Sequence, residues 1–241
     1  MIEYQHISKK FGEQEVLKDI SFQVPDGSRL CIVGGSGSGK SVTVKLLLGL
    51  ETTDEGEIII DQQAVRGFSQ TEWRNLLQEF GVVFQGAALF DSLNVLENVG
   101  LKLFEERSAS PSEIKQQVIE ALDQVNLSPD ILTKYPAELS GGMRKRVGIS
   151  RAIIDRPRYL IYDEPTTGLD PLSSQIIDDL MTELSKEPGR TSIIITHDMY
   201  TVRKLATQVI MLHNQEIIFD GTSADFFSSD LPEISTFLSR I

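Results

Sequence analysis

The segment Gly34–Ser41 constrains this chain more than any other feature. It reads Gly34-Gly35-Ser36-Gly37-Ser38-Gly39-Lys40-Ser41 and fits the pattern G-x-x-x-x-G-K-[ST]. An apolar run precedes it, and helical spacing of Val and Leu follows. In such a strand–loop–helix unit, glycines let backbone N–H groups face phosphate oxygens at the helix N-terminus. We therefore predict a phosphate-binding loop, in which Lys40 reaches the β- and γ-phosphates and Ser41 ligates Mg²⁺.

A second acidic motif strengthens this prediction. The run Arg158-Tyr159-Leu160-Ile161-Tyr162 is a predicted apolar strand, and it ends in Asp163 and Glu164. In proteins with a phosphate loop, an Asp at such a strand end holds Mg²⁺ through water. Glu164 would then polarise the water that attacks the γ-phosphate.

Composition and charge exclude several classes of protein. The chain has 241 residues, one Cys and a net charge of −12, so wrapping of nucleic acid is not expected. No apolar run approaches the roughly 20 residues that cross a bilayer, and the first residues do not read as a signal peptide. A lone Cys excludes an intrachain disulfide, and Cys31 reads as a small buried hydrophobe. These features predict a soluble, cytosolic protein.

The strand and helix signals change along the chain. Predicted strands are short and several are apolar throughout, which suits strands covered on both faces. They cover 16–24, 29–33, 57–60, 80–84, 159–162, 192–195, 209–212 and 216–219. Helical periodicity dominates 86–157, where Ser110-Pro111 is a plausible helix start. We predict an α/β domain covering 1–241, with a helical subdomain inserted at about 86–157 and short helices at about 222–241.

The segment Leu139-Ser140-Gly141-Gly142-Met143 precedes a predicted helix shortly before the Asp163-Glu164 strand. Together, these motifs resemble the ATPase subunit of an ATP-binding cassette (ABC) transporter over essentially the whole chain. The resemblance implies a P-loop ATPase fold with an antiparallel β subdomain and the inserted helical subdomain. It also implies that Ser140, Gly141 and Gly142 face the nucleotide held by a second subunit. Ser140 is suited to cap the helix.

The resemblance implies roles for four further residues. Phe11 matches the aromatic residue that stacks on adenine. Gln85 matches the glutamine that senses Mg²⁺ and the attacking water. His197 matches the histidine that contacts the γ-phosphate, and Asp170 matches a residue at the interface between two subunits.

The resemblance further implies an enzyme that uses ATP and Mg²⁺. Two copies would sandwich two ATP molecules head to tail and couple hydrolysis to a multi-span membrane permease. The permease would hold this chain on the cytoplasmic face of the inner membrane.

Two segments point to one branch of the family. The stretch Gln85–Val95, and Met143 with the basic residues after it, resemble ATPases of the Mla-type lipid transporters, which serve MCE-type substrate-binding proteins. The pairs Gly86-Ala87 and Ile149-Ser150 depart from that pattern. This branch implies phospholipid or another lipid as cargo, an MCE-type lipid-binding partner and a small accessory subunit.

Two alternatives remain open at this point. An amino-acid or ion importer ATPase shares every catalytic residue, so only the Gln85–Val95 and Met143 segments disfavour it. A non-transport ABC protein is disfavoured by the single cassette, by the lack of a long insertion and by the net charge of −12. The run Ala87–Phe90 is either core or a surface that docks a permease helix.

Overall fold

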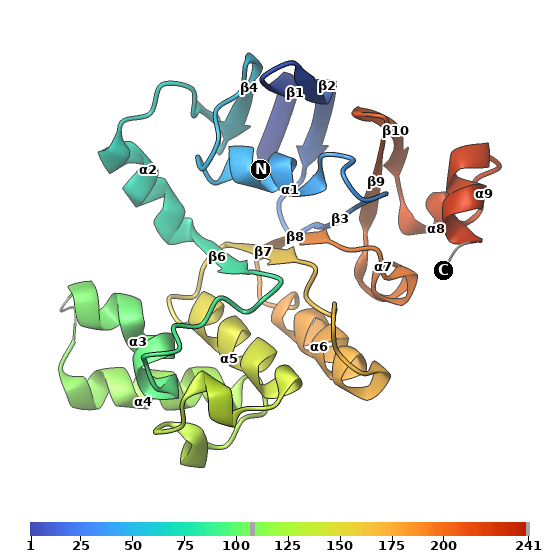
Figure 1. Cartoon of the computed structure of the whole chain (residues 1–241). Helices are drawn as coiled ribbons and strands as arrows, with labels where there is room; N and C mark the ends of the chain where they lie inside the picture. The colour runs from blue at the N-terminus through green and yellow to red at the C-terminus, as the bar shows by residue number, and fades with distance from the viewer. Residues whose placement is uncertain (107–108, 240–241) are drawn as a thin grey trace. The chain divides into compact units, whose positions relative to one another are not determined.

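The computed structural model describes residues 1–106 and 109–239. These residues form two compact units (Figure 1). The first unit comprises Met1–Leu77 and Ser185–Ile241, and the second comprises Gln78–Leu184. The strands and helices of each unit are described separately below.

The first unit contains an antiparallel sheet with the strand order β2-β1-β4-β5. Its strands are β1 (Ile2–Phe11), β2 (Gln14–Val24), β4 (Glu55–Ile60) and β5 (Gln63–Ala64). Buried and exposed residues alternate along β2 from Ile20 to Val24, so one face packs on the core. This sheet is the antiparallel β subdomain that the sequence predicts.

A second sheet in the first unit positions the phosphate-binding loop. Neighbouring strands follow the order β10-β9-β3-β8. They are β3 (Arg29–Gly34), β8 (Thr191–Ile195), β9 (Gln208–His213) and β10 (Glu216–Gly221). Strand β3 pairs in parallel with both β8 and β9, whereas β9 and β10 are antiparallel. All five residues of β8 are buried, as expected for a strand covered on both faces.

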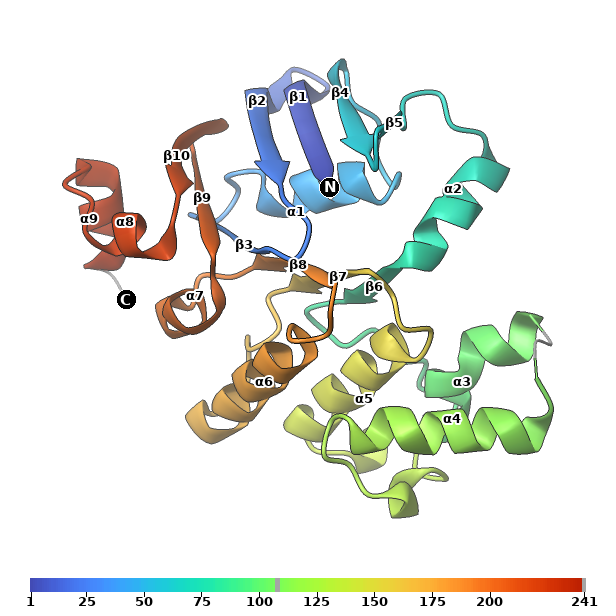
Figure 2. The ribbon, with the colours of Figure 1, turned by 180° about the vertical axis from the view of Figure 1, so that it is seen from behind.

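The helices of the first unit are α1 (Lys40–Leu47), α2 (Gln70–Leu76), α7 (Met199–Leu205), α8 (Ser223–Phe227) and α9 (Pro232–Leu238) (Figure 2). Helix α2 buries none of its residues completely, and Trp73 anchors it. A Cβ placed on Gly49 would lie 2.7 Å from the Trp73 ring, so this ring packs directly on the backbone beyond α1. Helix α8 contacts β9 and β10.

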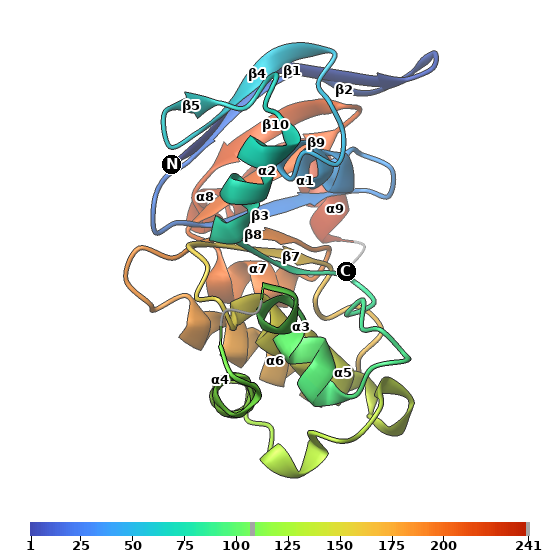
Figure 3. The same ribbon diagram turned by 90° about the vertical axis from the view of Figure 1, so that its left-hand side faces the viewer.

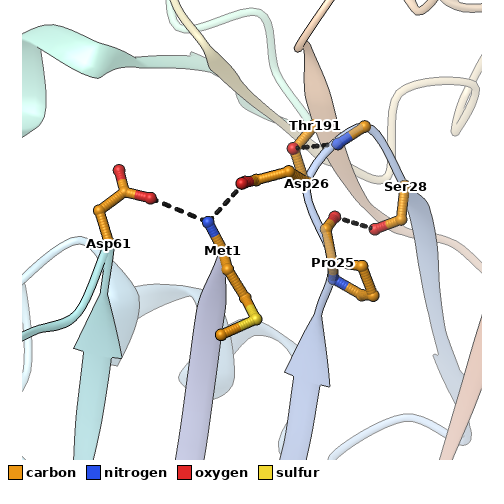
Figure 4. A network of polar contacts seen from close by, with 7 residues as sticks. Met1, Pro25, Asp26, Ser28, Asp61 and Thr191 are labelled. Atoms are coloured by element: carbon orange, nitrogen blue, oxygen red, sulfur yellow. Dashed lines mark hydrogen bonds and ion pairs between the residues drawn. The ribbon is translucent and has the colours of Figure 1, made fainter.

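Polar contacts join the start of β1 to two turns of the first unit (Figure 4). The Met1 ammonium pairs with Asp26 and, at 2.8 Å, with Asp61. In the turn after β2, the Gly27 N–H donates to the Thr191 hydroxyl at 2.9 Å. These bonds fix the turn that leads into β3.

The second unit combines a strand pair with helices. Strands β6 (Phe80–Val83) and β7 (Tyr159–Asp163) run parallel. Helices α3 (Val95–Glu106), α4 (Pro111–Asp123) and α5 (Gly141–Ile153) pack on one another, and α6 (Pro171–Leu184) contacts α5 (Figure 3). Short 3₁₀ helices cover 129–131 and 136–138, and another, 77–79, begins at Leu77, the last residue of the first unit's N-terminal segment. The unit therefore includes β6, β7 and α6 as well as the predicted helical segment.

The observed elements extend most of the predicted strands by one or two residues. Ser110 is a helix start as predicted, because its hydroxyl and Glu113 form a capping box on α4. The elements that were not predicted include β1, β5, α2, α6 and α7. Strand β1 has register shifts after Tyr4, Ile7 and Lys9, and these irregularities break the alternation by which a strand is recognised.

Candidate functional site

The loop Gly34–Ser41 joins β3 to α1, as the sequence predicts. Gly34 has φ +147°, and a Cβ there would lie 2.3 Å from the carbonyl oxygen of Leu212. Gly39 has φ +102°, and a Cβ there would lie 2.6 Å from the Leu17 side chain. Only glycine fits both positions, so the loop has a fixed shape set by its backbone.

The polar groups of this loop suit a polyphosphate. Lys40 Nζ donates to the carbonyls of Gly34 and Gly35 at 2.7 and 2.9 Å, which holds the ammonium over the loop. The Ser38 hydroxyl is buried and has no protein partner. A buried hydroxyl without a partner is costly, and a phosphate oxygen would satisfy it. Ser36, Gly37 and Ser41 are exposed.

Two more predicted residues belong to the first unit. Phe11 ends β1 with its side chain 44% exposed, and Lys9 Nζ lies 5.0 Å from the centre of its ring. A cation over one face leaves the other face of the ring for stacking. His197 follows β8 and is exposed, just before Asp198, whose carboxylate caps α7 through the Tyr200 N–H at 2.8 Å.

The predicted carboxylate pair lies in the second unit, at the end of β7. Asp163 is its last residue, and Glu164 follows with φ +51°, a left-handed conformation that residues with a Cβ seldom adopt. The Thr167 hydroxyl donates to Glu164 Oε2 at 3.0 Å and orients the carboxylate. Such strained backbone is often found at functional sites.

Gln85 follows β6 with an exposed side chain, and its backbone is fixed by a residue that the sequence analysis missed. Lys145 on α5 donates to the Gln85 carbonyl and, at 3.3 Å, to the Glu164 carbonyl. Burial lowers the pKa of Lys145, while the Glu164 and Asp163 carboxylates act in the opposite direction. One buried ammonium therefore links two predicted site residues.

The segment Leu139–Met143, called the signature segment from here on, spans the start of α5. Ser140 is the N-cap, and its hydroxyl accepts from the Met143 N–H at 3.3 Å. A Cβ on Gly142 would lie 3.2 Å from the Ser173 hydroxyl, and one on Gly141 would lie 3.5 Å from Leu169. The two glycines thus let α5 begin close to the segment that starts α6.

Asp170 has a local structural role. Its carboxylate accepts from the Ser173 hydroxyl at 2.6 Å and from the Ser173 N–H at 3.0 Å, at the start of α6. These hydrogen bonds lower the pKa of Asp170. The side chain is exposed and ionised, and it remains open to a partner.

The residues present also suit Mg²⁺. Within 1–106 and 109–239, no group of three or more His, Cys, Asp or Glu could hold a metal ion by itself. Mg²⁺ commonly binds through one or two protein oxygens together with substrate phosphates. Ser41 in the first unit, and Gln85 and Asp163 in the second, offer oxygens of this kind.

The structure thus divides the predicted residues between two units. The first unit holds the phosphate loop, Phe11 and His197, and the second holds the carboxylates, Gln85, the signature residues and Asp170. Lys145 and Arg151 were missed, although a basic pair on an otherwise apolar helical face is a signal that could have identified them. This fold, with a glycine-shaped phosphate loop between β3 and α1, defines a P-loop ATPase.

Comparisons with known proteins agree with this class. The sequence pattern of the family described as "ABC transporter" matches residues 17–167. The chain is 35% identical to protein TRIGALACTOSYLDIACYLGLYCEROL 3 of Arabidopsis thaliana, over 98% of this chain and 73% of that protein. It is also 35% identical to the glutamine transport ATP-binding protein GlnQ of Geobacillus stearothermophilus, over 100% of this chain and 99% of that protein.

A solved structure has a similar fold over most of this chain. It is the dimeric ATP-binding cassette MJ0796 in a post-hydrolysis state bound to ADP and Pi. The identity is 31% and the TM-score 0.84, over 92% of this chain and 99% of that one. This chain therefore belongs to the ABC transporter family. It is an ABC ATPase, and it uses ATP with Mg²⁺.

Proposed function

We propose that this chain is the ATP-hydrolysing subunit of a membrane transporter. The observation that carries the proposal is the phosphate loop, whose glycine-only backbone, buried Ser38 hydroxyl and Lys40 ammonium suit a nucleoside triphosphate. In the part of the chain that the structure describes, no helix is long and apolar enough to cross a membrane. In this proposal, a separate multi-span permease would hold the chain at the cytoplasmic face of the inner membrane.

The candidate residues have distinct roles in this proposal. Lys40 and the loop N–H groups neutralise and orient the β- and γ-phosphates. Ser41, Asp163 and Gln85 would provide oxygens for Mg²⁺, which would stabilise charge at the phosphate oxygens. Glu164 accepts a proton from the attacking water, and Gln85 orients that water. His197 contacts the γ-phosphate, and Phe11 stacks on adenine.

The working unit would be two copies of the chain arranged head to tail. Ser140, Gly141 and Gly142 would face the nucleotide of the partner copy, because they form the N-terminus of α5 and a helix N-terminus favours anions. The exposed Asp170 would contact the partner copy. Residues 1–241 would form one ATPase domain in each copy. The similar solved cassette is itself dimeric.

We further propose that the cargo is phospholipid or another lipid, delivered with an MCE-type lipid-binding protein and a small accessory subunit. Two segments support this, Gln85–Val95 and the signature segment with Met143. The name of the Arabidopsis relative includes the name of a galactolipid, trigalactosyldiacylglycerol, and this adds support for a lipid cargo. A second candidate is an amino-acid or ion importer, since the glutamine transport protein is equally identical to this chain.

The segment after Gln85 is the proposed docking surface for the permease. Ala87 is buried, but Phe84 and Phe90 are 40% and 52% exposed. The second unit also has an apolar hollow of about 680 Å³, lined by Leu96, Leu101 and Phe104 of α3 together with residues just before α3 and at the start of α4. Exposed apolar surface of this kind is typical of a protein interface.

Co-purification with the permease tests the docking surface and the cargo together. Phe90→Asp should leave ATP binding intact but abolish recovery with the permease, because a charge would be desolvated at the contact. Tyr135→Asp, at a side chain 46% exposed in the same unit, is the matched control. Normal recovery of Phe90→Asp would contradict this docking surface. Phospholipid in the purified complex supports the lipid proposal, and stimulation by an amino acid or ion instead supports the importer.

A further inference from the structure

Lys145 is a buried cation to which the proposed reaction gives no role. It is 6% exposed on α5, close to the buried apolar residues Val147 and Ile149. Burying an ammonium is unfavourable unless hydrogen bonds compensate, so an apolar residue would serve better if packing were its only task. We therefore expect the charge of Lys145 to contribute something other than packing.

The partners of this ammonium indicate the purpose. Lys145 Nζ donates to two backbone carbonyls, those of Gln85 and Glu164. These residues follow β6 and β7, which are separate parts of the sequence. An ammonium has three donors and so can bridge two carbonyls at once. One side chain thus fixes the backbone positions from which both candidate catalytic side chains extend.

The backbone at Glu164 makes this contact more informative. Its φ of +51° is unfavourable for a residue with a Cβ, so surrounding contacts must hold it. The Glu164 carbonyl accepts from Lys145 and from the Thr167 N–H, each at 3.3 Å, and the Thr167 hydroxyl holds the carboxylate at 3.0 Å. Loss of Lys145 would remove one of these restraints on the Glu164 backbone and loosen the position of its carboxylate.

The same face of α5 holds the rest of the loop after Gln85. A Cβ on Gly148 would lie 3.1 Å from the Ala87 Cβ, so the loop packs directly on the helix. Arg151 donates to the carbonyls of Ala87 and Ala88 at 2.9 and 2.7 Å. Lys145, Gly148 and Arg151 are spaced by three residues and share one helical face.

We propose that Lys145 is a positioning residue for ATP hydrolysis. It ties Gln85 and Glu164 to the signature helix α5, so that a movement of this helix displaces both side chains together. The proposal rests on the roles proposed above for Gln85 and Glu164. It adds a connection between the signature segment and the hydrolytic residues that passes through a single ammonium.

The test compares ATP turnover of three variants of the full chain in the purified transporter. Lys145→Met keeps the length of the side chain but cannot donate, and it should lower kcat about 10- to 100-fold with little change in KM for ATP. Lys145→Arg should recover most of the loss, because a guanidinium can also bridge carbonyls. Lys102→Met is the matched control, since Lys102 is a partly exposed cation of the same unit that pairs with Asp155 at 2.7 Å.

A double variant distinguishes positioning from a purely structural role. If Lys145 acts through Gln85, then Lys145→Met should lower kcat much less in the Gln85→Ala background than in the wild type. Independent multiplication of the two effects would overturn the proposal, as would a wild-type kcat in Lys145→Met. If Lys145→Met does not fold, Lys145→Gln carries the same test, because its shorter amide cannot reach both carbonyls.

The single variants separate failure of this proposal from failure of the proposed function. Wild-type turnover in both Gln85→Ala and Glu164→Gln would remove the roles on which the proposal rests. Lower turnover in those two variants, together with normal turnover in Lys145→Met, would overturn the role of Lys145 alone.

Discussion

The two units hold their candidate site residues by different physical means. In the first unit, the phosphate loop is shaped by its own backbone, through glycines that tolerate no Cβ and a lysine that bonds carbonyls of the same loop. In the second unit, cations of α5 bond the carbonyls of other segments. Arg144 bonds Leu139, Arg146 bonds Asn126, Lys145 bonds Gln85 and Glu164, and Arg151 bonds Ala87 and Ala88.

The difference teaches which parts of such a site can adjust. A loop whose shape is fixed by steric exclusion has one available conformation, so replacing one of its crowded glycines by a residue with a Cβ disrupts it. Loops fixed by long side chains depend on buried charge, and burial lowers the pKa of Lys145, Arg146 and Arg151. Under the proposals above, the first unit would offer a rigid receptor for phosphate, and the second would offer loops whose positions depend on α5.

The largest expected effect in this comparison is on ATP binding, and it comes from Lys40 in the phosphate loop of the first unit. Lys40→Ala should weaken ATP binding by about 10²-fold or more, because a charged donor to the phosphates is lost. Equilibrium binding of a fluorescent ATP analogue to the purified chain measures this. Lys45→Ala, at an exposed lysine on the same helix, is the control. Equal affinity in Lys40→Ala and the wild type would show that the loop does not hold phosphate through Lys40.

The next largest effect is expected on folding stability, from a substitution at Gly34 in the phosphate loop. Gly34→Ala should destabilise the chain by about 3 kcal/mol, because its Cβ would lie 2.3 Å from a backbone oxygen at a positive φ. Gly35→Ala should be nearly neutral, since a Cβ there meets nothing within 4 Å. Urea unfolding of both variants provides the measurement. Similar stability of the two would contradict the account of a loop fixed by its backbone.

The second unit should respond more weakly to a single change, because its loops have several tethers. Arg151→Met leaves the carbonyls of Ala87 and Ala88 without their donor and should cost about 2 kcal/mol. Arg74→Met, at an exposed arginine of α2, should cost far less. Thermal unfolding compares them. If Arg151→Met and Arg74→Met unfold at the same temperature, Arg151 does not fix the loop.

The same difference explains what the sequence could predict. The phosphate loop, its flanking strand and helix, and the Ser140 cap depend on neighbouring residues, so local patterns were sufficient. Lys145 and Arg151 act on segments distant in sequence, and no spacing rule connects Lys145 with Gln85. Strand β1 was missed because its register shifts disturb the alternation, and α2 because its seven residues hold a single large anchor, Trp73. The roles of the site residues remain predictions.

The smallest expected effect concerns pH and the exposed helix starts. Hydrogen bonds from Ser110 lower the pKa of Glu113 from its ordinary value of 4.5, and those from Ser69 do the same for Glu72. Because the folded pKa is the lower one, the stabilisation is complete above pH 4.5 and is lost as the pH falls below it. The free energy of unfolding of Glu113→Gln should be lower than that of the wild type at pH 7, and this difference should shrink in acid. A difference independent of pH would contradict this origin.

The measurement that tests the account most directly separates ATP binding from hydrolysis in Lys40→Ala and Glu164→Gln. Both variants are assayed as full chains in the purified transporter, for equilibrium ATP binding and for a single turnover. The account predicts that Lys40→Ala loses binding, whereas Glu164→Gln binds ATP as the wild type does and hydrolyses it about 10² to 10⁴ times more slowly. Near-normal hydrolysis by Glu164→Gln, or loss of binding in both variants alike, would contradict the division between a unit that binds phosphate and a unit that directs hydrolysis.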